Sequence, residues 1–130
     1  MTTAFGLGRI AQIAVNVRDV DRAQAFYRDV LGVKELFRAP NLAFFDCGGT
    51  RLMLGVPEKP EFDHPTSIIY FDVPDIEAAH QALSARGVAF VDTPHFVAPL
   101  GPRDLWMCFF RDSEGNLLGL QSEKARPQTA

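Results

Sequence analysis

The side chains best suited to chemistry lie in one segment, TPHFVAPLGPRDLWM, at residues 93–107. His95 can exchange a proton near neutral pH, a carboxylate such as that of Asp104 can orient an imidazole, and Trp106 can stack on a ligand. A structural explanation is equally open, in which His95 caps a loop, Asp104 ends a turn and Trp106 fills the core. We expect His95 to lie on a loop, residues 92–104, that leads to a strand beside a cavity.

Other kinds of site find little support in the sequence. It has no GxSxG elbow, no phosphate-binding loop, no GxGxxG pattern and no cysteine paired by spacing with a histidine. A net charge of −3 argues against a nucleic-acid partner, which would need clustered Lys and Arg. No run of about 18 apolar residues is present, so we expect no membrane partner.

The elements that position these residues are set by the stretch Ile10–Gly32, which predicts a strand, a turn and a helix. Apolar side chains alternate along the strand, and their period becomes helical from Val20 onward. Asp19 is placed to cap the helix, because its carboxylate can accept hydrogen bonds from the free N–H groups of the first turn. Gly32 marks the end of the helix.

The same pattern begins again at Ile69, which indicates an internal duplication. Asp75 repeats the helix cap and Gly87 repeats the stop. Each half then continues with strands joined by glycine-containing turns. We expect an α+β fold in one domain, residues 1–130, made of two tandem βαβββ modules. Module one spans about residues 8–57, a proline-rich linker about residues 57–65, and module two about residues 66–123.

These features resemble the vicinal oxygen chelate superfamily, also called the glyoxalase/bleomycin-resistance/dioxygenase family, over about residues 8–123. The resemblance rests on the strand Ile10–Val17 followed by Asp19, and on three further local patterns, which are Phe26-Tyr27-x3-Leu31-Gly32, Phe71-x-Val73-x-Asp75 and Phe110-x-Asp112-x2-Gly115-Asn116. It implies a curved mixed sheet around a cavity, helices on the outer face, and a cavity usually completed in a homodimer. It also implies, for the enzymes of the family, a divalent metal that chelates substrate oxygens.

The resemblance places the metal ligands at four cavity-facing strand positions, which in this chain are Gln12, Met53, Ile68 and Gly119. Hard and borderline divalent ions need several oxygen or nitrogen ligands at once, and only Gln12 supplies one. We therefore expect no metal at these positions and no cofactor. The alternative is a displaced metal site, for which the available ligands are His64, His80, His95, Asp104 and Glu123.

The leading hypothesis is a metal-independent protein that binds a small organic molecule in the cavity, as bleomycin-resistance proteins do. The residues expected to line the cavity are Gln12, Arg51, Met53, Tyr70, Asp104, Trp106 and Gly119. The alternative is a lyase, isomerase or dioxygenase-type enzyme, either metal-free with His95 as acid and base or using displaced metal ligands. A third possibility is a structural or regulatory protein with a vestigial pocket.

The two cysteines, Cys47 and Cys108, fall in apolar strand patterns and read as buried reduced thiols rather than a disulfide. The N-terminus MTTAFGLGR lacks the layout of a signal peptide. We therefore expect a cytoplasmic location, and the family resemblance implies a homodimer.

Overall fold

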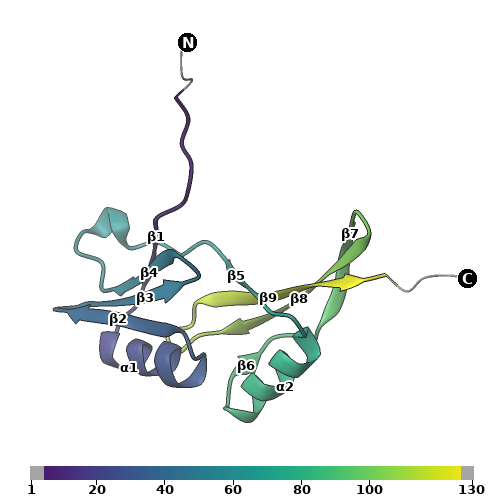
Figure 1. Ribbon diagram of the computed structural model, residues 1–130. Helices are drawn as coiled ribbons and strands as arrows, with labels where there is room; N and C mark the ends of the chain where they lie inside the picture. The colour runs from purple at the N-terminus through teal and green to yellow at the C-terminus, as the bar shows by residue number, and fades with distance from the viewer. Residues whose placement is uncertain (1–4, 127–130) are drawn as a thin grey trace, which may run out of the picture.

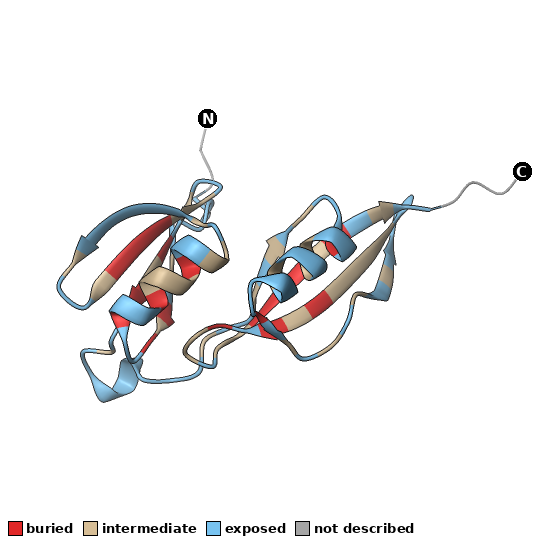
Figure 2. Cartoon of the chain, turned by 90° about the horizontal axis from the view of Figure 1, so that it is seen from below, coloured by how far each residue is buried: buried red, intermediate tan, exposed pale blue. Residues whose placement is uncertain are grey.

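The computed structural model describes residues 5–126, and the ends of the predicted domain, residues 1–4 and 127–130, lie outside them. Two βαβββ-type halves follow one another along the chain, each with its own mixed sheet and its own helix (Figure 1). Both helices lie on the same side of the molecule, where they cover one face of each sheet (Figure 2). The fold is therefore α+β, as the sequence predicts, with two sheets rather than one continuous sheet within the chain.

Sheet one contains β1 (Gln12–Asn16), β2 (Lys34–Ala39), β3 (Leu42–Cys47) and β4 (Thr50–Gly55), in the order β1-β4-β3-β2. β1 and β4 are parallel and the other pairs are antiparallel. Helix α1 (Val20–Ala25) continues into a π-helical turn, η1 (Phe26–Val30). Asp19 caps α1 through a hydrogen bond from the Arg22 N–H, and Gly32 follows with φ of 73°, so both predicted helix signals are confirmed.

Sheet two has five strands. Four of them are β5 (Ile69–Asp72), β6 (Ala89–Phe90), β8 (Arg103–Arg111) and β9 (Leu117–Ala125), in the order β5-β9-β8-β6, and the fifth also pairs with β8. Helix α2 (Ile76–Ala85) is capped by Asp75. The segment between the halves carries a short 3-10 helix, η2 (Pro60–Phe62). None of the helices in residues 5–126 is long and apolar enough to cross a membrane.

The prediction of a loop over residues 92–104 is wrong for its central part, which forms strand β7 (His95–Leu100). This strand pairs antiparallel with β8, and its register shifts between Phe96 and Ala98. Pro99 fits because β7 is an edge strand, where a missing N–H costs no ladder bond. His95 therefore begins a strand instead of lying in a loop.

The core lies between the helices and the covered sheet faces (Figure 2). Residues that alternate along the strands are buried there, among them Val15, Leu54, Phe45, Leu118 and Phe110. The other residues of the same strands form the uncovered face of each sheet, which we call the open face. The alternation seen in the sequence thus decides which side chains meet the helices and which remain available to a ligand.

Hydrogen bonds from the turn between β8 and β9, residues 112–116, hold the two halves together. The buried Tyr27 hydroxyl donates to Asp112 at 2.7 Å, and the Asn116 side chain donates to the Asn16 carbonyl at 3.0 Å. Glu114 accepts from the backbone N–H groups of Arg18 and Asp19. This turn fixes module two against the first helix of module one.

Candidate functional site

The open face of sheet one carries a connected row of polar and apolar side chains. Gln12 and Arg51 are register partners on β1 and β4, and the Arg51 Nε donates to the Gln12 Oε1 at 2.6 Å. The Gln12 Nε2 in turn lies 3.7 Å from the Met53 Sδ. The Arg51 guanidinium carbon lies 5.5 Å from the centre of the Phe44 ring. The structure thus brings together three predicted ligand-binding residues, Gln12, Arg51 and Met53.

The open face of sheet two holds a second group centred on Tyr70. Its ring lies over Gly119, since a Cβ added at Gly119 would come within 2.7 Å of a Tyr70 ring carbon. Phe109 packs edge-on against Tyr70, with 5.8 Å between ring centres. Tyr70 and Gly119 are therefore direct neighbours, and the missing side chain at Gly119 is what makes room for the tyrosine ring.

His95 also belongs to the open face of sheet two. It pairs with Met107 across the strands, and its ring centre lies 6.5 Å from that of Phe109. The Nδ1 lies 2.8 Å from the Thr93 carbonyl oxygen, which fixes the proton on Nδ1 and leaves Nε2 unprotonated in the neutral ring. An Asp92 carboxylate oxygen lies 3.8 Å from the same Nδ1.

Asp92 is therefore the carboxylate beside His95, a role that the sequence analysis gave to Asp104. Its position is itself fixed, because its other oxygen accepts the Phe109 N–H at 2.7 Å. Asp92 precedes His95 by three residues, and this spacing is the signal that could have identified it.

Trp106 and Asp104 lie on the covered face of sheet two, away from His95. Trp106 pairs with the buried Ser122 and packs against the core, with the Lys124 ammonium 3.9 Å from its ring centre. Asp104 forms an ion pair with Arg126 at 2.9 Å. Because adjacent residues of a strand point to opposite faces, Trp106 and Met107 cannot share the open face. Trp106 and Asp104 therefore have structural roles here, one packed against the core and the other in an ion pair, and neither lies beside His95.

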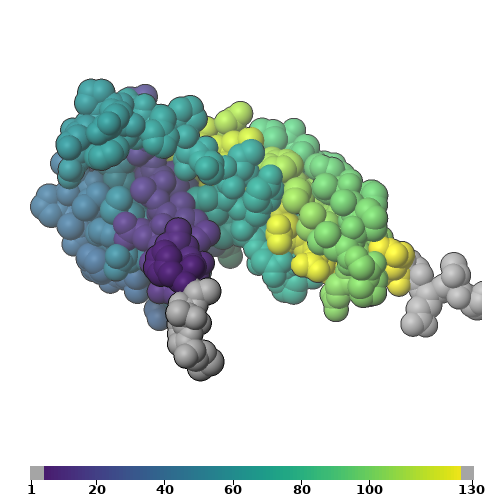
Figure 3. All heavy atoms as spheres, turned by 90° about the horizontal axis from the view of Figure 1, so that it is seen from above, coloured from purple at the N-terminus to yellow at the C-terminus, as the bar shows by residue number. Residues whose placement is uncertain are grey.

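Two hollows adjoin the open faces. A groove of about 560 Å³ separates the two sheets, and Arg51 lines it from one side and Tyr70 from the other. A smaller, mainly apolar pocket of about 350 Å³ lies over sheet one, between Met53, Leu42 and the linker residue Phe62. Figure 3 shows the molecule from the side opposite the helices, with module one in purple to teal beside the green and yellow of module two.

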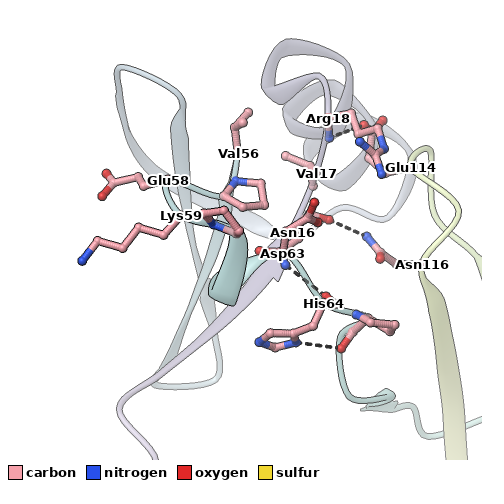
Figure 4. A pocket seen from close by; sticks show the side chains of 13 residues that line it. Asn16, Val17, Arg18, Val56, Glu58, Lys59, Asp63, His64, Glu114 and Asn116 are labelled. Carbon is pink, nitrogen blue, oxygen red and sulfur yellow. Dashed lines mark hydrogen bonds between the residues drawn. The ribbon is translucent and has the colours of Figure 1, made fainter.

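A further hollow, about 660 Å³, lies at the junction of the two modules (Figure 4). Its polar wall is held by internal hydrogen bonds. The Asn16 side chain donates hydrogen bonds to the carbonyl oxygens of Phe62 and His64. The Glu114 carboxylate accepts hydrogen bonds from the N–H groups of Arg18 and Asp19 and from the Arg22 side chain. These contacts explain the hollow as part of the connection between linker and modules, and we assign no ligand to it.

The four positions at which the resemblance places metal ligands do not fit a hard divalent ion. Gln12 uses its amide on Arg51 and Met53, and the site of a side chain at Gly119 is filled by the Tyr70 ring. Ile68 has only an alkyl side chain. Elsewhere in residues 5–126, no three His, Cys, Asp or Glu side chains lie together as a metal site would require.

The sequence profile of the Glyoxalase/Bleomycin resistance protein/Dioxygenase superfamily matches residues 9–120. The chain belongs to this superfamily. A glyoxylase-like domain-containing protein of Didymella fabae is 28% identical over 123 residues, which cover 84% of this chain and 89% of that protein.

Solved structures of the superfamily share the fold. A member from Sphaerobacter thermophilus superposes with a TM-score of 0.72 at 27% identity, covering 90% of this chain and 98% of that one. Lactoylglutathione lyase from Agrobacterium tumefaciens gives a TM-score of 0.66 at 22% identity, covering 89% and 94%. At 22% identity the likeness to the lyase concerns the fold alone.

Proposed function

We propose that this superfamily member binds a small organic molecule at the open faces of its sheets, without the metal used by enzymes of the family. One observation carries the proposal: the ligand positions of the family are engaged by neighbouring side chains. Gln12 bonds to Arg51 and Met53, and Tyr70 covers Gly119. What remains at these positions is amide, thioether and aromatic surface, which suits an organic molecule better than an ion.

The proposal includes a homodimer in the cytoplasm. Several large apolar side chains on the open faces are exposed in the single chain, including Phe37 at 50% and Tyr70 at 41%. A second copy placed over the open faces would cover this surface and enclose the ligand. Cys47 and Cys108 are both free thiols, which favours a reducing compartment.

Metal content of the purified protein tests the first part of the proposal. The protein is prepared without chelator or metal-affinity tag, and its metals are counted by elemental mass spectrometry. We expect far less than one divalent metal per chain, together with an increase in melting temperature when a matching organic ligand is added. One metal per chain, lost when His95 or Glu123 is replaced, would contradict the proposal and indicate displaced ligands.

A second candidate function is metal-free enzyme chemistry, favoured by the geometry at His95. Its Nδ1 is held by the Thr93 carbonyl with Asp92 nearby, so the Nε2 can accept a proton from a substrate on the open face. Replacing His95 by Ala distinguishes the two functions. Turnover would be lost if His95 acts as a base, whereas ligand binding alone would be weakened only slightly. An Asp104→Ala variant, changed on the other face, serves as the control.

A further inference from the structure

The guanidinium group of Arg51 is held in place from one side only. The Nε donates to the Gln12 Oε1 at 2.6 Å, and among the described residues the two Nη nitrogens have no hydrogen-bond or ion-pair partner within reach. Gln12 thus fixes the plane of the group while its outer edge stays free. A planar fork with two free nitrogens is the arrangement that binds a carboxylate through two parallel hydrogen bonds.

The acidic side chains that line the groove with Arg51, Asp46 and Asp72, form no ion pair with it. Asp46 is its register partner on β3, but the Asp46 Oδ1 accepts the Gly49 N–H at 2.9 Å and no ion pair with Arg51 forms. Asp72 lies across the groove on β5, and Lys34 adds a second positive charge to the same groove. The groove therefore contains two cationic and two acidic side chains, and Arg51 is the cation with a prepared hydrogen-bonding geometry.

An aromatic surface adjoins the free edge of Arg51. Phe44 lies beneath the guanidinium, and Phe37 stacks on Phe44 with 4.4 Å between ring centres and 22° between ring planes. Phe44 is nearly buried at 9% exposure, whereas half of the Phe37 surface is accessible. A planar apolar group can extend this stack from the Phe37 side.

We infer that the ligand carries a carboxylate on a planar, apolar body, with the carboxylate bound by the Arg51 Nη nitrogens and the body against Phe37. The inference rests on the proposed function, because it names the class of molecule that the open face receives. Tyr70 also lines this groove, and its hydroxyl is a further hydrogen-bond donor there. Arg51 then determines specificity for charge, and the two phenylalanines determine specificity for shape.

Three probes of similar size test the inference: benzoate, benzamide and benzylamine. Binding is followed by NMR titration of the backbone amides together with the Arg51 Nε–H and the Gln12 side-chain amide. We expect benzoate to bind about tenfold more tightly than benzamide, because charge-assisted hydrogen bonds are about twice as strong as neutral ones. Benzylamine should bind more weakly than either.

The variants Arg51→Gln and Arg51→Lys separate charge from geometry. Arg51→Gln should abolish the preference for benzoate over benzamide, and Arg51→Lys should restore only part of it, since lysine offers a charge without the fork. Arg38→Gln is the matched control. Arg38 lies on the same sheet but bonds to Asp21 and Gln24 on α1, so its loss should leave the preference unchanged.

The outcomes distinguish this inference from the proposed function. If the neutral probe binds the open face as well as benzoate does, or if Arg51→Gln keeps the preference, the carboxylate inference is wrong while the binding function stands. If no probe shifts any open-face resonance at high millimolar concentration, both are wrong. Circular dichroism confirms that each variant is folded, which we expect because Arg51 is exposed.

Discussion

The carboxylate of Glu114 should make the connection between the two modules sensitive to acid. It accepts hydrogen bonds at 2.7–3.0 Å from the N–H groups of Arg18 and Asp19, from the Arg22 Nε and Nη2, and from the Ser113 hydroxyl. Its side chain is only 1% exposed. Hydrogen bonds, foremost those from Arg22 and then those from the Asp19 and Arg18 N–H groups and Ser113, lower the pKa of Glu114 from 4.5 to about 2, whereas burial raises it.

The change in pKa sets the size of the effect. Each pKa unit corresponds to about 1.4 kcal/mol, so the full difference would contribute about 3 kcal/mol to the free energy of unfolding. The Arg22 side chain is 56% exposed, so solvent screens the pair, and we expect about 2 kcal/mol. Because the pKa of Glu114 is lower in the folded than in the unfolded chain, this contribution is complete above about pH 5. It disappears as the pH falls from about 4.5 towards 2.

Urea denaturation of the wild type and of Glu114→Gln measures this contribution between pH 7 and pH 3. The variant should be about 2 kcal/mol less stable at pH 7, and more than half of that difference should be lost at about pH 3. Glu58→Gln, in the exposed linker, should change stability by less than about 0.5 kcal/mol at either pH. The reasoning would be refuted if the difference in unfolding free energy between the wild type and Glu114→Gln stayed constant with pH, or if no difference were found at pH 7.

Three further predictions concern the core and the open face. Gly119→Ala should destabilise the protein by about 1–3 kcal/mol in urea denaturation, because its Cβ would come within 2.7 Å of the Tyr70 ring. Combining Gly119→Ala with Tyr70→Ala should recover part of the lost stability. Gly8→Ala is the control, because Gly8 lies in open space and the change should alter stability little. Equal losses of stability for Gly119→Ala and Gly8→Ala would contradict the packing described for Tyr70. Tyr27→Phe should lower the free energy of unfolding by about 1–2 kcal/mol, because it removes the buried hydrogen bond to Asp112. Tyr70→Phe should leave the free energy of unfolding unchanged. A Tyr27→Phe variant as stable as the wild type would show that this hydrogen bond contributes little. Burial raises the pKa of the Cys108 thiol to about 11, so iodoacetamide at pH 8 should label it far more slowly in the native protein than in urea, and equal rates would contradict its burial.

The sequence predicts the faces of the sheets because alternation is a local property. Ile13, Val15, Leu52 and Leu54 turn towards the helix, and Gln12, Arg51 and Met53 turn away, as the pattern indicates. The helix caps at Asp19 and Asp75 are equally local, since each cap acts within one turn. These features needed no knowledge of the tertiary structure.

The segment around His95 was harder to predict because its structure depends on a partner strand. Prolines and a glycine indicate a loop, yet pairing with β8 makes β7 a strand. Once Trp106 is placed in β8, its alternation with Met107 puts it on the covered face, so the grouping of Trp106 with His95 fails. Asp92 lies only three residues before His95, so a local spacing could have suggested it, but the bond from the Phe109 N–H that fixes its carboxylate comes from the partner strand.

The hairpin turns at corresponding places in the two modules differ in how far their sequences can change. The turn at residues 112–116 holds the modules together through Asp112, Glu114 and Asn116, so most substitutions there should disturb the whole molecule. Its counterpart around Gly48 and Gly49 borders the groove instead and needs mainly its positive φ angles. The turn around Gly48 and Gly49 can therefore be lengthened by insertions, which would change the surroundings of the ligand without destabilising the fold.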